Sequence, residues 1–293
     1  MAPQLVVVAS AASSSSSSAA TSAPAASLTP TAVDALEVVA SDDEEEVVAK
    51  APQGSRQVAL TTRRPSFEVA SIAQQLPPVG ERCTRLYLCR HGQTEYNRLC
   101  KYQGRGVDTV LNGMGLLQAT CLAHAMRHVP LRAIYSSSLR RAFETATLVA
   151  KFHPKVELQH FSDLEEMSFG VMEGQDHVLF EDVVDSVHAQ WDGGDFGVRF
   201  PSGECPLDVV SRGVSRINAL VQAAQGQDHV LIVAHGRFNK VVLAQMLDGH
   251  LNNMHELHQD NTCVNVVDYD HDTHQYHAVA LNNTIHLPPT LTP

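Results

Sequence analysis

Residues 86–97 read LYLCRHGQTEYN, and this stretch decides the fold prediction because its apolar start ends abruptly at Arg90-His91-Gly92. The apolar run predicts a buried strand over 85–89, and a glycine after it permits a tight turn and a close backbone approach. Open α/β sheets bind ligands at the carboxyl ends of their strands. The stretch therefore predicts a site for a small oxyanion at a sheet edge; the alternative is a surface histidine beside an arginine.

A second predicted strand ends in the same way. Residues 229–234 are a continuous apolar run, and His235-Gly236 follows it directly. If the two strands are neighbours in one parallel sheet, His91 and His235 lie at the same edge, because parallel strands end on the same side.

Helices and strands alternate from residue 84 onward. The predicted strands cover 85–89, 133–135, 156–158, 229–234, 263–269 and 275–281, and the predicted helices cover 94–101, 113–128, 139–152, 176–190, 207–224 and 237–247. Such alternation predicts an α/β fold with a mostly parallel central sheet covered by helices on both faces. The hairpin-like connection between the last two strands predicts at least one antiparallel edge strand.

The composition limits the classes of function. The chain has 293 residues and a formal net charge of −11, which disfavours non-specific nucleic-acid binding. Its six cysteines are scattered with no C-x-x-C pair, so we expect reduced thiols in a reducing compartment. No apolar run reaches the roughly 18 residues that a membrane span needs. We therefore expect neither a nucleic-acid partner nor a membrane. The oligomeric state stays open, with a homodimer among the alternatives.

The first 82 residues are predicted to be a disordered tail before a folded domain over 83–288, and 289–293 a short C-terminal tail. A serine run and an acidic run fall in this segment, and such sequences bury too little apolar surface to offset their ordering entropy. The first 49 residues contain no Lys or Arg, unlike transit peptides, so a cytoplasmic location is expected and organelle targeting is the alternative. Ser41 and Ser66 are candidate phosphorylation sites, and an unmodified linker is favoured.

The chain between the two His-Gly pairs supplies charged groups suited to phosphoryl transfer. Arg140 and Arg141 fall in the first turn of a helix predicted to be capped by three serines over 136–138. Cations at a helix N-terminus oppose the helix dipole, which suggests that an anion lies there. Arginines clamp phosphoryl oxygens, a neutral imidazole can attack phosphorus, and a carboxylic acid can protonate the leaving alkoxide. The acid-rich loop over 163–174 supplies such carboxyl groups.

Metal binding is the competing use of histidines. No H-E-x-x-H or comparable spacing surrounds His91 or His235. His271, His274 and His277 near the terminal hairpin are a weak candidate chelate, and a solvated turn is favoured. We expect no metal and no cofactor.

The stretch RHGQTEYN over 90–97 resembles the signature of the histidine phosphatase superfamily, whose fold is phosphoglycerate mutase-like. Further blocks resemble those of the family in the same order: Gln103-Gly104 with Asp108, Leu111, Gly115 and Gln118-Ala119; Ser138 to Ala142; Leu164 to Glu166 with Gly170 and Glu173-Gly174; Pro201 to Glu204 with Arg212; and Val233 to Gly236. The likeness covers 84–287 and implies a three-layer α/β/α sandwich and a catalytic domain. It departs at Cys205, where the family has serine.

The resemblance implies a role for each matched residue. His91 would be the phosphorylated nucleophile, Glu166 rather than Glu165 the acid/base, and Arg141 rather than Arg140 the second arginine that, with Arg90 and His235, holds the phosphoryl group. The implied substrate-binding set is Arg90, Gly92, Thr94, Asn97, Gln103, Gly104, Arg141, Glu166, His235 and Gly236. Glu173 would order its loop, and Cys89 would serve in packing.

The resemblance implies a metal-independent phosphatase that acts on a small phosphorylated metabolite through a phosphohistidine. The glycolytic mutases of the family carry a basic stretch between the acid/base Glu and the second His, whereas residues 167–234 contain three arginines and no lysine. Mutase activity is therefore the alternative, and a catalytically weak regulatory protein that binds a phospho-ligand is another. Aromatic and sulfur side chains could wall an apolar pocket, with core packing an equal alternative: Phe169, Met172, Trp191, Phe196 and Phe200.

Overall fold

The computed structural model describes residues 36–39, 46–49 and 69–292, and the chain divides into a unit over Met1–Pro65 and a unit over Ser66–Pro293. In the first unit β1 (Leu36–Val39) pairs antiparallel with β2 (Glu46–Ala49). The sequence analysis assigned no strand there; both segments are rich in valine, which favours extended backbone. Ser41, Ser66 and the rest of the predicted tail before residue 69 lie outside the described residues.

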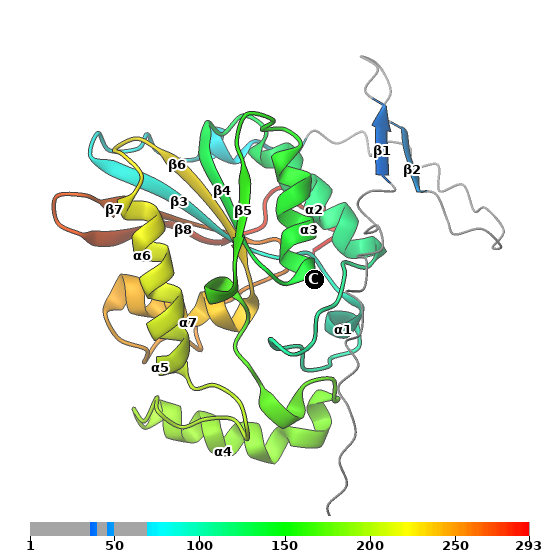
Figure 1. Ribbon diagram of the computed structural model, residues 1–293, viewed down its shortest axis with the longest axis vertical. Helices are drawn as coiled ribbons and strands as arrows, with labels where there is room; N and C mark the ends of the chain where they lie inside the picture. The colour runs from blue at the N-terminus through cyan, green and yellow to red at the C-terminus, as the bar shows by residue number, and fades with distance from the viewer. Residues whose placement is uncertain (1–35, 40–45, 50–68, 293) are drawn as a thin grey trace, which may run out of the picture. The chain divides into compact units, whose positions relative to one another are not determined.

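The second unit contains every element of the predicted domain (Figure 1). In chain order these are η1 (Ile72–Gln75), β3 (Cys83–Arg90), α1 (Glu95–Arg98), α2 (Gly113–Met126), β4 (Leu131–Ser137), α3 (Arg140–Ala150), β5 (Leu158–Phe161), η2 (Ser162–Leu164), η3 (Gly170–Met172), η4 (His177–Phe180), α4 (Glu181–Asp192), α5 (Pro206–Val209), the π-helical turn η5 (Val210–Val214), α6 (Ser215–Gln222), β6 (His229–Ala234), α7 (Gly236–Asp248), β7 (Val264–Asp270) and β8 (Gln275–Asn283).

A six-stranded sheet forms the centre of this unit, with strand order β5-β4-β6-β3-β7-β8. The pairs β5–β4, β4–β6 and β6–β3 are parallel, and β7 and β8 run antiparallel. The predicted mostly parallel sheet with an antiparallel edge strand is thereby confirmed. The prediction that depended on strand adjacency is confirmed too, since β3 and β6 are direct neighbours.

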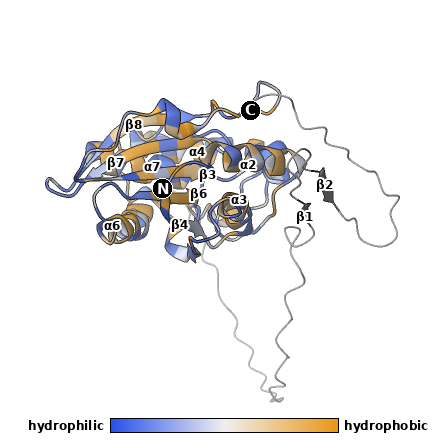
Figure 2. Cartoon of the chain, turned by 90° about the horizontal axis from the view of Figure 1, so that it is seen from above, coloured by the Kyte–Doolittle hydropathy of each residue, from blue (hydrophilic) through white to orange (hydrophobic). Residues whose placement is uncertain are grey.

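Alternating side chains of the central strands build two apolar cores, one on each face of the sheet. On β3, Leu86 and Leu88 face a core shared with α5, α6 and α7, whereas Tyr87 and Cys89 face a core shared with α2 and α3. This follows from the period of two in a strand. Figure 1 shows α2 and α3 on the opposite side of the sheet from α6 and α7, and Figure 2 shows hydrophobic residues concentrated in these elements. The three-layer α/β/α prediction is correct.

The packed part of the chain extends to the N-terminal side of residue 83. Ile72 in η1 is 1% exposed and belongs to the core on the α2 side. The domain boundaries at 82/83 and 288/289 stay predictions as divisions of the chain. Ile72 nevertheless belongs to this core, and Val69, Ala73 and Leu76 pack against it.

Two local predictions were wrong. The strand expected over 156–158 lies at Leu158–Phe161, because β4 offers its parallel register there, with Ile134 opposite Leu158. The expected cap by the serines over 136–138 differs as well: Ser137 Oγ accepts from the N–H of Leu139 at 3.2 Å, one residue before α3 begins. The N–H of Arg140 donates to Asp108 Oδ1 at 2.7 Å, and Leu139 in the cap position makes no side-chain cap bond. A loop 32 residues away thus caps α3.

Close backbone approach at Gly115 yields a stability prediction. A Cβ added to Gly115 would lie 2.0 Å from the carbonyl oxygen of Gln93, whereas a Cβ on Gly113, in the same turn of α2, would meet nothing within 4 Å. We expect Gly115→Ala to destabilise the fold by about 1–3 kcal/mol, because the loop after His91 must shift, and Gly113→Ala to be neutral or stabilising. Urea unfolding of both variants measures the difference; equal stability would contradict it.

Candidate active site

The two histidines that follow the central strands meet at one sheet edge. Arg90 pairs with Ala234 at the end of the parallel β3–β6 ladder, and the His91 N–H donates to the Ala234 carbonyl at 3.1 Å. The imidazole rings of His91 and His235 are 5.2 Å apart between centroids, at 59°. Parallel pairing therefore brings together two residues 144 positions apart in the sequence.

The tautomer of His91 follows from one hydrogen bond. Its Nδ1 lies 2.7 Å from the Gly92 carbonyl oxygen. A carbonyl can only accept, so Nδ1 carries the proton and donates, and Nε2 of the neutral ring keeps its lone pair. His91 is thus oriented as a nucleophile with Nε2 as the reacting atom.

Both rings are held neutral by their surroundings. Burial, with the positive charges of Arg141 and Arg90, holds the pKa of His91 well below its ordinary value of 6.5. Burial and the charge of Arg141 do the same to the pKa of His235. Desolvation and nearby cations both disfavour the imidazolium form. A neutral ring is the form that can attack an electrophile.

Two arginines act on these rings through their charge. Arg141 is fully buried, and its guanidinium donates to the carbonyls of Val107 and Gly104 at 2.9 and 3.2 Å. Arg90 donates to the Gln259 carbonyl at 2.6 Å. The Nε atoms of both arginines, and both ring nitrogens of His235, are buried without a hydrogen-bond partner among the described residues. Buried donors of this kind are costly unless they bind an acceptor, so the cluster suits an oxyanion.

The neighbouring arginine has a different place. Arg140 is half exposed at its side chain, with Nη2 3.9 Å from Glu144. Burial lowers the pKa of Arg141 to about 10, so it remains a cation at neutral pH. Helix α3 thus turns one arginine of the pair into the site and the other to its surface.

Glu166 is fixed by backbone N–H groups at the start of α7. Its Oε1 accepts from Phe238 at 2.7 Å and from Met167 at 2.9 Å, and its Oε2 accepts from the Arg237 N–H at 3.1 Å. Helix α7 begins directly after His235. The first turn of α7 therefore holds the carboxylate beside the histidine pair.

The preceding residue, Glu165, points elsewhere. Its carboxylate accepts from Arg105 at 2.8 Å and from Ser138 at 2.5 Å. The backbone of both glutamates is held by Arg212, whose guanidinium donates to the carbonyls of Glu165 and Glu166 at 2.7 and 3.0 Å and pairs with Glu204 at 2.9 Å. These contacts fix which carboxylate of the pair faces the site.

A cavity of about 400 Å³ opens over this cluster. Five of the predicted site residues line it, namely Arg90, His91, Asn97, Gln103 and Glu166. Arg141 and His235 do not line it and are fully buried. The His235 ring lies 5.2 Å from the His91 ring, and the charge of Arg141 lowers the pKa of His91. Arg90, His91 and Glu166 are therefore the members of the cluster that line the cavity.

The other predicted binding residues position their neighbours, either by hydrogen bonds or by allowing close approach of the backbone. Thr94 is fully buried, and its hydroxyl bonds Asn97 at 3.0 Å and Gln103 at 2.9 Å. A Cβ on Gly236 would lie 3.3 Å from Arg90 Nε, and one on Gly92 would lie 2.5 Å from the Gly115 carbonyl. Gly104 likewise leaves room for Glu173, whose carboxylate accepts from the Gly106 N–H at 2.7 Å and so orders this loop.

Sequence reasoning missed several lining residues. These are Gln93, Tyr96, Cys100, Lys101, Tyr102, His177, Arg237 and Asn261. Arg237 directly follows the second His-Gly, so its position was a usable signal. His177 and Asn261 come from connections whose path the sequence does not reveal. Of the predicted apolar wall, Phe169 lines the cavity, whereas Met172, Trp191 and Phe200 are buried in the core and Phe196 packs against it.

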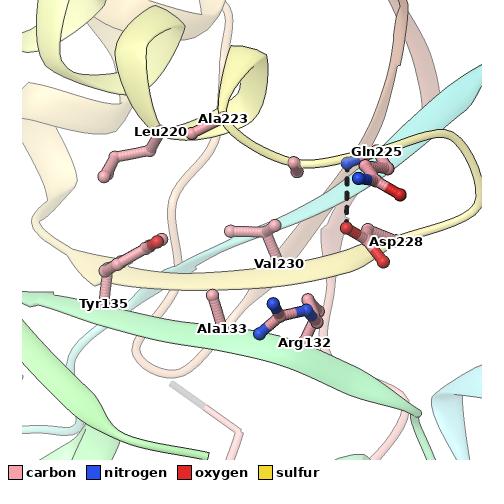
Figure 3. Close-up of a pocket in the computed structure, with 9 residues that line it drawn as sticks. Arg132, Ala133, Tyr135, Leu220, Ala223, Gln225, Asp228 and Val230 are labelled. Atoms are coloured by element: carbon pink, nitrogen blue, oxygen red, sulfur yellow. Dashed lines mark hydrogen bonds between the residues drawn. The ribbon is translucent and has the colours of Figure 1, made fainter.

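Nothing else in the described part of the chain competes with this site. No group of three or more His, Cys, Asp or Glu side chains could hold a metal ion there, and His274 bonds Tyr269 instead. None of the helices described is long and apolar enough to span a membrane. A second cavity of about 230 Å³ lies at the opposite end of the sheet, between the starts of β4 and β6, where Arg132 and Asp228 line it (Figure 3). It contains none of the predicted site residues.

Comparisons with known proteins agree with this geometry. A family model described as histidine phosphatase superfamily (branch 1) matches residues 86–284. The chain is 33% identical over 210 residues to a broad-specificity phosphatase of Saccharomyces cerevisiae, an alignment that covers 69% of this chain and 87% of the relative.

Solved structures give the same picture. A mycobacterial glucosyl-3-phosphoglycerate phosphatase superposes with a TM-score of 0.61 at 26% identity, covering 69% of this chain and 99% of the other. A phosphoglycerate mutase from Bacillus anthracis superposes with a TM-score of 0.60 at 24% identity, covering 70% of this chain and 96% of the other. The second likeness shows a shared fold, which is the phosphoglycerate mutase-like fold that the sequence predicted.

Proposed function

We propose that this chain, which belongs to the histidine phosphatase superfamily, hydrolyses small phosphomonoesters through a phosphohistidine on His91. That it is a phosphatase of this family is supported by its phosphatase relatives. The observation that carries the mechanism is the His91 Nδ1 bond to the Gly92 carbonyl, because it leaves Nε2 unprotonated on a residue that lines the cavity.

In the proposed first step, His91 Nε2 attacks phosphorus and the bond from phosphorus to the ester oxygen breaks. Arg90, Arg141 and His235 supply buried donors for the non-bridging oxygens, whose charge shifts as the bonds change. Glu166 gives its proton to the departing alkoxide. The Oε2 atom suits this role because it accepts a single hydrogen bond, from Arg237, and keeps a free lone pair.

In the proposed second step, a water molecule attacks the phosphohistidine. Glu166, now a carboxylate, takes a proton from that water, the P–N bond breaks, and the electron pair returns to His91 Nε2. Inorganic phosphate leaves, and the enzyme regains both its neutral imidazole and its protonated carboxyl group. Each atom and proton is thus accounted for by residues of the site.

Water rather than a second substrate hydroxyl is the proposed acceptor. The chain between Glu166 and His235 carries three arginines, and two of them are engaged in ion pairs away from the cavity: Arg199 with Asp208 and Arg216 with Asp163. The third, Arg212, is held by Glu204. All three arginines of this stretch are therefore engaged within the fold, in contrast to the basic stretch of the glycolytic mutases.

A substrate panel tests the proposal. Phosphate release from a set of phosphorylated metabolites is measured with EDTA present, and conversion of 3-phosphoglycerate to 2-phosphoglycerate is measured with and without 2,3-bisphosphoglycerate. We expect phosphate release that EDTA leaves unchanged, and mutase turnover slower than hydrolysis. Stimulated interconversion faster than hydrolysis would show a mutase, and the absence of both activities would show a binding protein.

The lowered pKa of His91 predicts the acid limb of the pH profile. A protonated imidazole cannot attack, so activity falls as pH falls through the pKa of His91, which lies well below 6.5. We therefore expect protonation of His91 to cause no loss of kcat/KM between pH 7 and 6, and the acid limb to appear only at lower pH. Alkyl and aryl phosphates are compared because the phosphate group itself titrates at about pH 6. A midpoint that belongs to the substrate changes between the two, whereas one that belongs to His91 does not. A midpoint at or above 6.5 for both substrates would contradict this.

A further inference from the structure

Arg237 is a cation of the cavity wall that the proposed chemistry does not use. It lines the cavity with its neighbours Tyr102 and Glu166, and it lies half-buried in the first turn of α7. Only its backbone N–H contacts Glu166, at 3.1 Å. The side chain is therefore available for a purpose of its own.

The guanidinium of Arg237 rests on uncharged groups. One Nη lies 3.3 Å from His188 Nε2 and the other 3.5 Å from His255 Nδ1, and its central carbon lies 5.9 Å from the centroid of the Trp191 ring. Burial lowers the pKa of His188 to about 3 and lowers that of His255, so both rings are neutral partners at neutral pH. They orient the guanidinium without cancelling its charge.

No carboxylate forms an ion pair with Arg237 within the described residues, although acids outnumber bases in the chain by 32 to 21. Several arginines elsewhere in the domain do have such partners, as Arg105 has in Glu165 and Arg216 has in Asp163. A half-buried charge without a counterion is costly. The proposed chemistry already uses Arg90 and Arg141 for one phosphoryl group. Arg237 is a further cation of the cavity lining, and the charge of Glu166 acts on it without forming an ion pair.

We propose that Arg237 is a specificity-determining residue that binds a second anionic group of the substrate, a carboxylate or a second phosphate. The inference rests on the proposed function, and it adds a class of substrate: phosphomonoesters with another anion a few bonds from the scissile phosphate. A planar guanidinium fork suits either anion, since both present two oxygens in parallel. Phosphomonoesters without that group bind by the phosphoryl group alone.

Equilibrium binding to the His91→Ala protein tests this without turnover. Two matched pairs are titrated by calorimetry: 3-phosphoglycerate against glycerol 3-phosphate, and fructose 1,6-bisphosphate against fructose 6-phosphate. We expect the doubly anionic member of at least one pair to bind about 10- to 100-fold more tightly, as for one charge-assisted contact. The pair that shows the preference identifies the anion. Adding Arg237→Gln is expected to abolish it.

Lys240 provides a matched control, because it is a second cation one turn further along α7, donates to the His255 carbonyl at 3.4 Å and does not line the cavity. Lys240→Gln should keep the preference, whereas a general field effect would lower it in both variants. The proposal is overturned if neither pair shows a preference, or if Arg237→Gln weakens both members of a pair alike. Failure of the proposed function shows separately, as absence of phosphate release by the unmodified protein.

Discussion

Replacing His91 by alanine is expected to lower kcat/KM for every substrate by at least about 10⁴-fold, since the nucleophile is removed. His91 lines the cavity, and its Nε2 keeps the lone pair because Nδ1 donates to the Gly92 carbonyl. No neighbour can substitute for it. His235 lies beside it but has no hydrogen bond that selects a tautomer among the described residues. The measurement is phosphate release at saturating and subsaturating substrate.

A second buried histidine controls for general effects of removing an imidazole. His153 is buried, its Nε2 lies 3.2 Å from the Met126 carbonyl, and burial lowers its pKa as well. It is not a residue of the cavity. The His153→Ala protein should therefore retain activity at temperatures where it is folded. A His91→Ala protein with more than about a hundredth of wild-type activity would contradict the assigned nucleophile.

Glu166→Gln is expected to cause the second largest loss, about 10²- to 10⁴-fold for alkyl phosphates. Glutamine keeps one carbonyl oxygen, which can still accept from the N–H groups of Phe238 and Met167. Its NH2 group then replaces the oxygen that accepts from the Arg237 N–H, and it cannot transfer a proton. Aryl phosphates leave without protonation, so formation of the phosphoenzyme from them should be slowed far less. Rapid mixing with 4-nitrophenyl phosphate should then give a burst of nitrophenol followed by slow turnover, because the second step still needs the base.

Glu165→Gln is the matched control for this variant, since it changes the adjacent carboxylate, which is bound by Arg105 and Ser138. We expect it to cost far less activity and to show no burst. Equal slowing of phosphoenzyme formation from alkyl and aryl phosphates in Glu166→Gln would refute its role as the acid. A burst in the Glu165 variant would transfer that role to its neighbour.

Those parts of the fold that follow from apolar periodicity could be predicted from the sequence. The apolar runs before His91 and His235 are uninterrupted and buried, so both strands were predictable. That the two strands are direct neighbours was only a condition of the prediction, and the structure supplies it. Strand β5 was misplaced because its residues are half exposed and its position is set by the register of β4. The cap of α3 was missed because Asp108 is remote in sequence.

The residues of the site also differ in how far the sequence could predict them. Residues next to the strand ends, and those in recognisable blocks, were assigned from the sequence, including the choice of Arg141 and Glu166 within their pairs. Residues whose role depends on a long-range path were not. Asn261 donates to the His91 carbonyl at 3.1 Å from a connection before β7, and nothing in its local sequence indicates this. The aromatic residues over 191–200 suggested an apolar cluster, but the sequence does not show which of their side chains face the cavity. In the structure Trp191 and Phe200 are buried in the core.

Trapping of the covalent intermediate is the most direct test of the proposed mechanism. The protein is mixed with a ³²P-labelled phosphomonoester, quenched within one turnover in alkaline denaturant, digested and mapped. A P–N bond survives alkali and breaks in acid, so we predict an alkali-stable, acid-labile label on the peptide that contains His91, and no label on the His91→Ala protein. Phosphate release from the wild type with no label, or a label on another residue, would contradict the phosphohistidine on His91.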